Sequence, residues 1–293
     1  MTERFRGFGY ALIDRGSPHH LDELLRAVAD AGYDYAEVDP RNWNVWLGGR
    51  VNGAELGRWA DVLERHRGRL RYTLHGSLEL NLFETPERGL HESLLRAGLE
   101  VSRAVGAELT VYHPGWRPTP SVDRMTDLLA RERETLREVA GELKAWGGRL
   151  AVETWYSVGA VGYSYAVWPE QLAAQVEAID HGAVGVCLDF SHLFLASEWF
   201  GFDFLDGVRR LAPLANHLHV QDTFGVSSDL NIPALGKGDL HLPPGWGAIP
   251  LADAFAVGDF VLRPVFMVEV LDERLLARLD ATLATARQLA GPG

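Results

Sequence analysis

Residues 184–221 read VGVCLDFSHLFLASEWFGFDFLDGVRRLAPLANHLHVQ and contain the pattern that decides the fold. The segment begins with the apolar run Val184–Asp189, continues with a helical stretch, and returns to a β-rich run at 217–221. Near-continuous apolar runs are typical of parallel strands that are buried on both faces. The segment therefore predicts a strand–helix–strand unit with parallel strands.

The same alternation repeats eight times, and no linker or low-complexity segment interrupts it. Eight such units predict a (β/α)8 TIM barrel as a single domain over residues 1–293, because these barrels typically have about 250 residues. An open doubly wound sheet fits less well, since the glycines of GFGYALIDRG (7–16) precede a strand instead of a helix. The predicted strands are 8–13, 35–39, 70–75, 109–113, 150–154, 184–189, 217–221 and 265–270.

Amphipathic patterns between these strands predict the helices. Residues 121–148 form the longest such pattern, which the pair Gly147–Gly148 ends, and 272–291 form the last. In 21–32, which stops at Gly32, apolar residues recur at the helical spacing i, i+3, i+4 and i+7: Leu21, Leu24, Leu25 and Val28.

The composition is that of a globular protein, with 47% hydrophobic and 23% charged residues. Cys187 is the single cysteine, which excludes an intrachain disulfide. The opening MTERFRGFGYALIDRG lacks the basic region and apolar run of a signal peptide, and no apolar run approaches the roughly 20 residues that span a bilayer. We therefore expect a cytoplasmic protein with no membrane contact.

The formal net charge is −12, and Lys144 and Lys237 are the only lysines. Proteins that bind nucleic acid through its phosphates usually carry a basic stripe, and this chain shows no run of Lys or Arg. The charge argues against nucleic acid as a partner and leaves a small molecule as the expected one. The sequence also leaves a homo-oligomer open.

Imidazoles and carboxylates gather where the predicted strands end. Active sites of TIM barrels lie at the C-terminal ends of the strands. This ligand set suits zinc, manganese or iron, and carboxylates held together in a cleft repel one another unless a cation neutralises them. The sequence thus predicts a metal site with one to three divalent ions, Zn²⁺ or Mn²⁺, held by His75, His113, Glu153, Asp189, His192, His219, Asp239, His241 and Glu269.

Each of these residues taken singly also has a structural interpretation, because a lone histidine at a strand end is often only a hydrogen-bonded core residue. The interpretation is weakest for Glu153 and Glu269, since carboxylates flanked by apolar strand residues are rarely buried unpaired. His217 faces the same side as His219, and we interpret it as a deeper core residue. Glu37 and Asp39 lie at the end of the second strand and are candidate metal ligands, candidate supports of a metal ligand, or candidate substrate contacts; Glu37 is assigned to the predicted substrate contacts.

Tryptophans are concentrated in the predicted loops at the same rim. An indole ring suits the apolar face of a sugar, and its N–H can donate to a hydroxyl. The equally good alternative is that these rings pack the loops onto the barrel. The predicted substrate contacts are Trp43, Trp46, Trp116, Trp155 and Trp246, and Trp199 lies in a further loop of this kind.

The strings YTLHG, VYHPGW, VET, GVCLDFSH, HLHVQD, DLHLPPGWGAIP and VEV, in this order, resemble the xylose isomerase-like TIM barrels. That superfamily includes sugar isomerases and epimerases and also endonuclease IV. The resemblance extends from about residue 70 to residue 272 and is looser before it. The block HLPPGWGAIP is similar to proteins described as sugar phosphate isomerase/epimerase.

The resemblance to ketose epimerases implies one metal held by Glu153, Asp189, His219 and Glu269. It also implies that the two glutamates exchange protons with the substrate and that His192 binds it. One feature departs from that pattern: the arginine that follows the strand-seven histidine in those epimerases has no counterpart in HVQDTFGVSSD. This difference affects the expected mode of sugar binding.

The resemblance to endonuclease IV implies three zinc ions, because all nine of its ligand positions are matched. The DNA-reading features are not matched. The pair that wedges into DNA is Leu78 and Glu79 here, and ETW replaces the motif ENT after strand five. The resemblance to endonuclease IV therefore supports the metal ligands more strongly than it supports DNA as the substrate.

These observations favour a metal-dependent isomerase, epimerase or related lyase that acts on a small sugar or sugar phosphate. Glu153 and Glu269 would be its acid/base pair, acting on a metal-stabilised enediolate. The alternative is a multinuclear zinc phosphoesterase resembling endonuclease IV. A non-catalytic binding protein is the third interpretation, and it would be expected to have lost a ligand.

Overall fold

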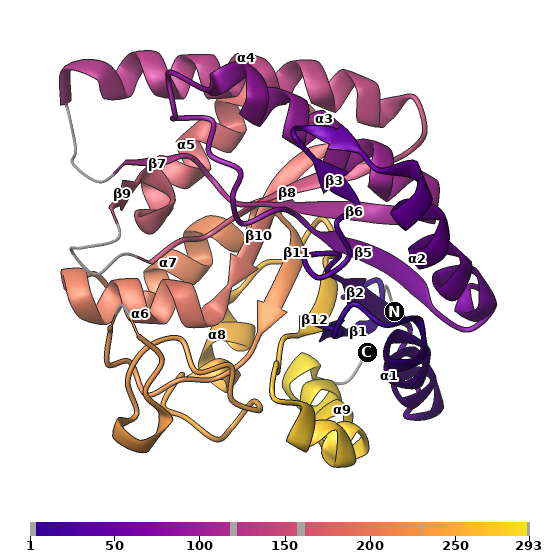
Figure 1. Ribbon diagram of the computed structural model, residues 1–293. Coiled ribbons are helices and arrows are strands. Elements are labelled where there is room, and N and C mark those ends of the chain that lie inside the picture. Colours follow the sequence, from indigo (N-terminus) through magenta and orange to yellow (C-terminus); the bar gives the residue numbers. More distant parts are fainter. Residues whose placement is uncertain (1–3, 118–121, 157–161, 229, 292–293) are drawn as a thin grey trace.

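The computed structural model describes residues 4–117, 122–156, 162–228 and 230–291. Eight parallel strands close into a barrel in the order β1-β12-β11-β10-β8-β6-β5-β2 (Figure 1). This confirms the predicted barrel, and each predicted strand overlaps one of its members. The strands are β1 (Phe8–Leu12), β2 (Tyr35–Val38), β5 (Arg71–His75), β6 (Ala107–Tyr112), β8 (Arg149–Glu153), β10 (Val184–Asp189), β11 (Ala215–Val220) and β12 (Val265–Val268).

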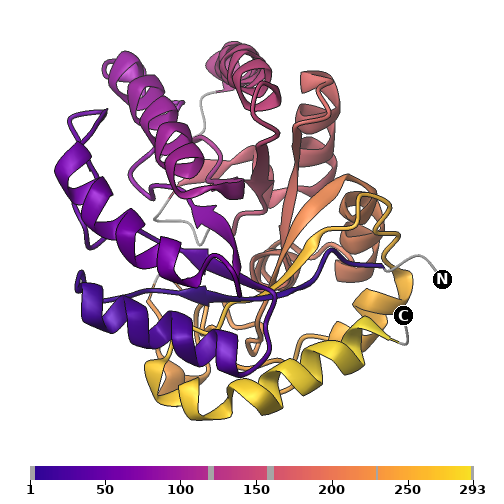
Figure 2. The same cartoon turned by 90° about the vertical axis from the view of Figure 1, so that its right-hand side faces the viewer.

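Helices surround the strands, as the turned view shows (Figure 2). The apolar stripe predicted for the first helix is buried in α1, where Leu25 and Val28 have no exposed surface. The helices are α1 (Pro18–Asp30), α2 (Gly53–His66), α3 (Arg88–Val105), α4 (Val122–Lys144), α5 (Pro169–Ile179), α6 (Phe190–Phe200), α7 (Phe204–Leu211), α8 (Leu251–Val257) and α9 (Leu279–Ala290).

Two predicted helices differ from the structure at their ends. The helix predicted for 121–148 stops at Lys144, before the left-handed Gly147 (φ +78°), and its predicted first residue lies outside the described residues. The pattern 272–291 begins with the 3₁₀ helix η4 (Glu273–Arg278), and α9 follows it. The Asp272 side chain accepts a hydrogen bond from the N–H of Arg274, which favours a tight first turn.

Two small antiparallel pairs were not predicted. β3 (Trp46–Leu47) pairs with β4 (Arg50–Val51), and β7 (Trp116–Arg117) pairs with β9 (Tyr163–Ser164). All four strands have only two residues, which is too short to give a periodic signal in the sequence. They belong to the segments that follow barrel strands β2, β6 and β8, so they shape the surroundings of the strand ends.

The barrel interior changes in character along its axis. An apolar cluster of Leu109, Val111, Ala151 and Cys187 fills one part of it, and Tyr35 packs with Met267 in another. Nearer the C-terminal ends of the strands, the inward residues are polar. None of the described helices combines the length and the apolar character needed to cross a bilayer.

Candidate metal centre

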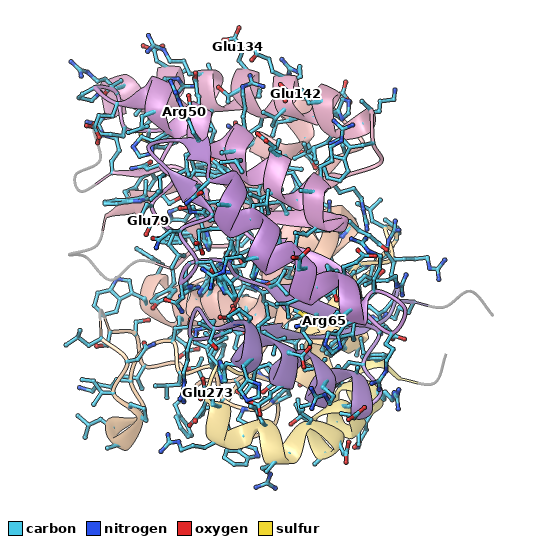
Figure 3. All side chains as sticks on the ribbon, turned by 45° about the vertical axis from the view of Figure 1, so that its right-hand side comes forward. Arg50, Arg65, Glu79, Glu134, Glu142 and Glu273 are labelled. Atoms are coloured by element: carbon cyan, nitrogen blue, oxygen red, sulfur yellow. The ribbon has the colours of Figure 1, made fainter. Side chains whose placement is uncertain are left out.

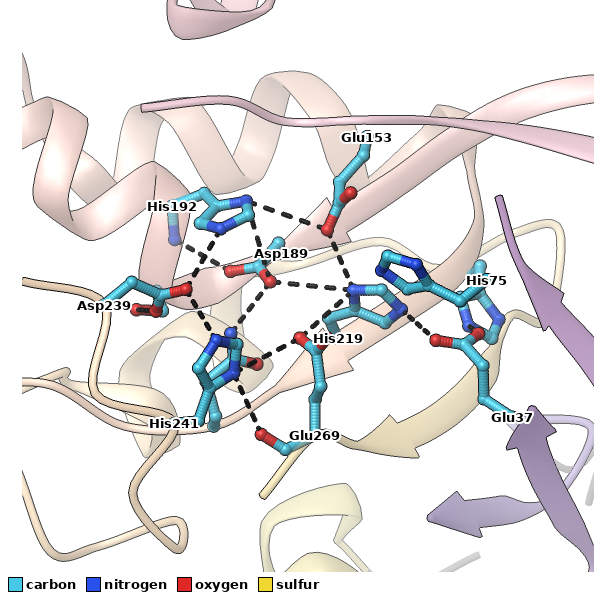
Figure 4. A network of polar contacts seen from close by, with 12 residues as sticks. Glu37, His75, Glu153, Asp189, His192, His219, Asp239, His241 and Glu269 are labelled. Carbon is cyan, nitrogen blue, oxygen red and sulfur yellow. Dashed lines mark hydrogen bonds and ion pairs between the residues drawn. The ribbon is translucent and has the colours of Figure 1, made fainter. Parts of the chain in front are cut away.

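Four barrel strands bring a carboxylate or an imidazole to one point. Glu153 and Asp189 end β8 and β10, His219 lies in β11, and Glu269 follows β12. Each offers one ligand atom, and these four atoms all lie within 4.8 Å of one another. His219 Nδ1 is 2.9 Å from Glu153 Oε1 and 3.3 Å from Glu269 Oε2 (Figure 4). We refer to these four residues as the strand cluster.

His75 and His113 extend the strand cluster on one side. They end β5 and follow β6, and their ligand atoms lie within 4.8 Å of one another and of Glu153. His113 Nε2 is 2.9 Å from Glu153 Oε2, and the two imidazole centroids are 4.8 Å apart. Glu153 therefore belongs to both groups and could bridge two ions.

His192, Asp239 and His241 form a third group, which we call the loop cluster. Asp239 Oδ2 lies 3.3 Å from His192 Nε2 and 2.8 Å from His241 Nε2 (Figure 4). Ser191 donates a hydrogen bond of 2.6 Å to the other oxygen of Asp239. His241 has a φ of +47°, a left-handed conformation that is uncommon outside glycine. All nine predicted residues thus lie in one region of the barrel.

The strand cluster has the properties of a cation site. Asp189, Glu153 and Glu269 are at most 5% exposed, so water does not screen their mutual repulsion. Among the described residues, Glu269 Oε2 and His113 Nδ1 are buried without a hydrogen-bond partner. A divalent ion such as Zn²⁺ or Mn²⁺ fits this set of donors, because it would bind the Glu269 oxygen that accepts no hydrogen bond and would neutralise the carboxylates.

The two glutamates have opposite electrostatic environments. Burial raises the pKa of Glu269 to about 8, and the nearby carboxylates of Asp189 and Glu153 add to that effect. Burial also opposes ionisation of Glu153, but the imidazoles of His113 and His219 hold the pKa of this carboxyl group well below its usual value. The same fold therefore gives two similar carboxyl groups different proton affinities.

Of the roles that the sequence left open for Glu37, the structure favours support of a metal ligand, because this residue lies inside the barrel. It is 1% exposed, and its Oε1 accepts a hydrogen bond of 2.8 Å from His219 Nε2. Its Oε2 accepts hydrogen bonds from His217 Nε2 (2.8 Å) and Thr73 Oγ1 (2.9 Å). His217 is fully buried, as predicted, but its partner on β2 could not be inferred from the sequence.

Trp155 lies beside two of the candidate metal ligands. Its ring centroid is 6.0 Å from that of His113 and 6.2 Å from that of His192. Its Nε1 is buried and, among the described residues, has no hydrogen-bond partner. Trp46 and Trp116 are half-buried on the small strands β3 and β7.

The other tryptophans predicted at the rim lie in three different surroundings, and only Trp199 is outside the predicted loops. Trp43 is 2% exposed, and its Nε1 donates to Asp14 at 2.8 Å, so this indole packs a loop instead of facing a cleft. Trp246 is 48% exposed and lies beneath the Arg278 guanidinium, 5.1 Å from ring centroid to charge. Trp199 belongs to α6 and not to a loop.

A cavity of about 320 Å³ lies beside the strand ends. Trp46 and Leu94 give it an apolar side, and Ser77 and Glu79 belong to its polar side. Arg41 lines both this cavity and a narrower crevice that reaches Glu37, His75 and Glu269. Arg41 is therefore the residue that the cavity shares with the crevice at the candidate metal ligands.

Several residues that support the site were not predicted. Gln221 donates to Asp189 Oδ2 at 2.9 Å, and Asp222 accepts hydrogen bonds from the N–H groups of Gly245 and Ile249 and so holds the loop that carries His241. Glu132 on α4 is fully buried and accepts from the Tyr112 hydroxyl.

One sequence signal could have identified Glu132. Leu128, Glu132 and Leu136 follow one another at intervals of four residues, which places a carboxylate on the apolar face of the helix. The carboxylate also accepts hydrogen bonds from the Gly115 N–H (2.9 Å) and Gln175 Nε2 (3.1 Å). Glu132 therefore ties α4 to the loop that follows His113.

Comparisons with solved structures find the same fold. A D-psicose 3-epimerase from Clostridium cellulolyticum H10, solved with D-tagatose, is 17% identical with a TM-score of 0.68, over 97% of this chain and 99% of that one. A 3-keto-D-glucoside 4-epimerase from E. coli is 15% identical with a TM-score of 0.67, over 96% and 98% of the two chains.

A xylose isomerase domain protein from Alicyclobacillus acidocaldarius is 21% identical with a TM-score of 0.65, over 97% of this chain and 99% of that one. At these identities the likeness establishes the shared fold. No curated protein sequence matches the chain significantly. The family model described as xylose isomerase-like TIM barrel matches residues 25–286, and the chain therefore belongs to that family.

Proposed function

We propose that the protein is a divalent-metal-dependent isomerase or epimerase of a small sugar or sugar phosphate. The observation that carries the proposal is the strand cluster, in which Glu153 and Glu269 come from β8 and β12 with Asp189 and His219 between them. The fold neighbours include enzymes named as ketose 3-epimerases, which supports this class of substrate.

The chemistry of such a reaction is proton transfer at a carbon beside a carbonyl group. A bound divalent cation stabilises the negative charge that develops on adjacent substrate oxygens. Glu153 and Glu269 are the acid/base pair in this proposal, and they act from opposite sides of the reacting carbon. Removal of a proton by one glutamate and delivery of a different proton to the opposite face by the other inverts the carbon, whereas delivery of a proton to the neighbouring carbon isomerises the sugar.

Substrate recognition in this proposal uses Trp155 and His192 first. The buried Nε1 of Trp155, unpartnered among the described residues, is a donor for a sugar hydroxyl, and the indole ring presents an apolar face to the sugar carbons. Trp46 lies farther out, at the cavity beside the strand ends. In this proposal the small polyhydroxylated ligand is therefore bound through polar and aromatic contacts.

The direct test is reconstitution of the metal-free protein with one ion at a time, followed by NMR of ketoses and sugar phosphates in D₂O. We expect Mn²⁺ or Zn²⁺ to restore exchange of one carbon-bound proton for deuterium together with conversion to a second sugar. If no sugar in the series exchanges a proton with any ion, the proposal fails.

The loop cluster supports one competing function, a multinuclear zinc phosphoesterase. Together with His75 and His113, the loop cluster supplies candidate ligands beyond the four that one ion needs. Elemental analysis of protein purified without chelator or histidine tag separates the two functions. One tightly bound ion per chain supports the isomerase, and two or three zinc ions with hydrolysis of a phosphate ester support the phosphoesterase.

A further inference from the structure

The His219 imidazole has carboxylates on both sides: those of candidate metal ligands face Nδ1, and that of Glu37 faces Nε2. Its Nδ1 faces the strand cluster, where Glu153 Oε1 is 2.9 Å away and Asp189 Oδ2 is 3.6 Å away. Its Nε2 faces the opposite direction, into the barrel, and lies 2.8 Å from Glu37 Oε1 (Figure 4). His219 and Glu37 are 0% and 1% exposed, so solvent does not replace either contact.

The chemistry of imidazole links these two contacts. A neutral imidazole has one N–H and one lone pair, and a metal takes the lone pair. An ionised carboxylate can only accept hydrogen bonds, so Glu37 requires an N–H at Nε2. The hydrogen bond to Glu37 therefore leaves the lone pair of His219 at Nδ1, on the side of the metal ligands.

Glu37 is itself held in place from two directions. It lies on β2, and its register partner Thr73 on the neighbouring β5 donates to Oε2 at 2.9 Å. His217 Nε2 donates to the same oxygen at 2.8 Å. Since β1 and β12 separate β2 from β11 around the barrel, the carboxylate reaches His217 and His219 across the barrel interior.

We infer that Glu37 is a positioning residue, which fixes the tautomer and the direction of the His219 imidazole so that Nδ1 is presented to the metal. The inference rests on the proposed function only in requiring a metal at the strand cluster. It selects one of the roles that the sequence left open for Glu37, in place of the substrate contact. Carboxylates that accept from a ligating histidine orient the ring and raise its basicity, and their loss typically costs about 10- to 100-fold in metal affinity or activity.

The first experiment compares Glu37→Gln and Glu37→Asp with the unchanged protein by calorimetric titration of Mn²⁺ into metal-free samples. A carboxamide must present an N–H₂ group either to His219 or to His217 and Thr73, and it carries no charge. We expect Glu37→Gln to weaken Mn²⁺ binding about tenfold or more. Glu37→Asp keeps the charge but shortens the reach, so we expect an intermediate affinity.

The second readout reports the tautomer directly and does not require turnover. NMR of the ¹⁵N-histidine protein loaded with Zn²⁺ should show one imidazole with the metal at Nδ1 and a protected N–H at Nε2. We expect this signature to be lost or split in Glu37→Gln. If Glu37→Gln keeps both the signature and the unchanged affinity for Mn²⁺, the inference is wrong.

A milder pair of variants covers the case in which Glu37→Gln does not fold. Thr73→Val removes one donor to Glu37, and Thr110→Val is the matched control. Thr110 is also a buried strand threonine, but its hydroxyl pairs with Ser102 at 2.5 Å. We expect Thr73→Val alone to weaken Mn²⁺ binding several-fold, and equal effects of the two variants would contradict the inference.

These measurements separate the inference from the proposed function. A protein that binds Mn²⁺ in a Glu37-dependent way but converts no sugar contradicts the proposed function and supports the role of Glu37. A protein that epimerises sugars and binds Mn²⁺ equally well with glutamine at position 37 contradicts the role of Glu37 and leaves the proposed function standing.

Discussion

The strand cluster and the loop cluster contain similar donors but are built differently. Glu153, Asp189 and His219 belong to barrel strands, so the hydrogen bonds of the parallel ladder fix their backbones. Asp239 and His241 lie in a loop that depends on side-chain contacts such as those of Asp222. The positions of Glu153, Asp189 and His219 follow from closing the barrel. The positions of Asp239 and His241 depend on the conformation of one loop. From this difference we expect the strand cluster to decide whether a metal binds and the loop cluster to affect the other properties of the proposed site.

The largest expected effect comes from the two glutamates of the strand cluster. Glu153→Gln and Glu269→Gln keep the shape of the side chain but remove the proton-transferring group, so we expect kcat to fall about 10²- to 10⁴-fold. Glu134→Gln is the control, because Glu134 is exposed on the outer helix α4 (Figure 3). Full activity of either cluster variant would contradict the proposed mechanism.

The second largest effect is expected on the thermal stability of the protein when a metal ion binds. A metal that binds the folded chain alone stabilises it by about 2.7 kcal/mol at 100 times its Kd, so we expect Mn²⁺ to raise the midpoint of thermal unfolding by several degrees. His219→Asn should abolish most of this increase, and His241→Asn should leave most of it. Differential scanning calorimetry with and without the ion measures both, and an equal loss in the two variants would remove the distinction between the clusters.

A smaller effect is expected from the loop cluster itself. In Asp239→Asn we expect the number of tightly bound ions per chain to stay at its original value and kcat/KM for the sugar to fall less than tenfold. Elemental analysis together with kinetics measures the two quantities. Loss of one zinc ion per chain in this variant would instead favour the phosphoesterase.

The smallest effect is expected at Trp155. Trp155→Phe removes the indole N–H but keeps an aromatic ring, and a single hydrogen bond contributes about 0.5–1.5 kcal/mol. We therefore expect KM to rise up to about tenfold while kcat changes little. Trp246→Phe is the matched control on an exposed ring, and a KM increase of equal size there would argue against a specific contact at Trp155.

The sequence predicted best what a single strand determines. The position of Glu153 or Asp189 at the end of an apolar run is a local feature, and the barrel then brings such ends together. Contacts between strands far apart in the chain leave no local signal. The Glu37–His217 hydrogen bond was not predicted because 180 residues separate the two. For a related reason the sequence could not choose between substrate contact and loop packing for Trp43, because its partner Asp14 follows a different strand.

The position of Glu132 has a consequence for any survey of inactive variants. This carboxylate holds the loop after His113 from a helix outside the barrel, through the Gly115 N–H and the Tyr112 hydroxyl. We therefore expect substitutions at position 132 to shift the candidate metal ligand His113 without touching metal or substrate. A library screened only for loss of turnover would group this residue with the active site. Screening the same library for retained folding would show that the catalytic geometry extends into the outer shell of the molecule.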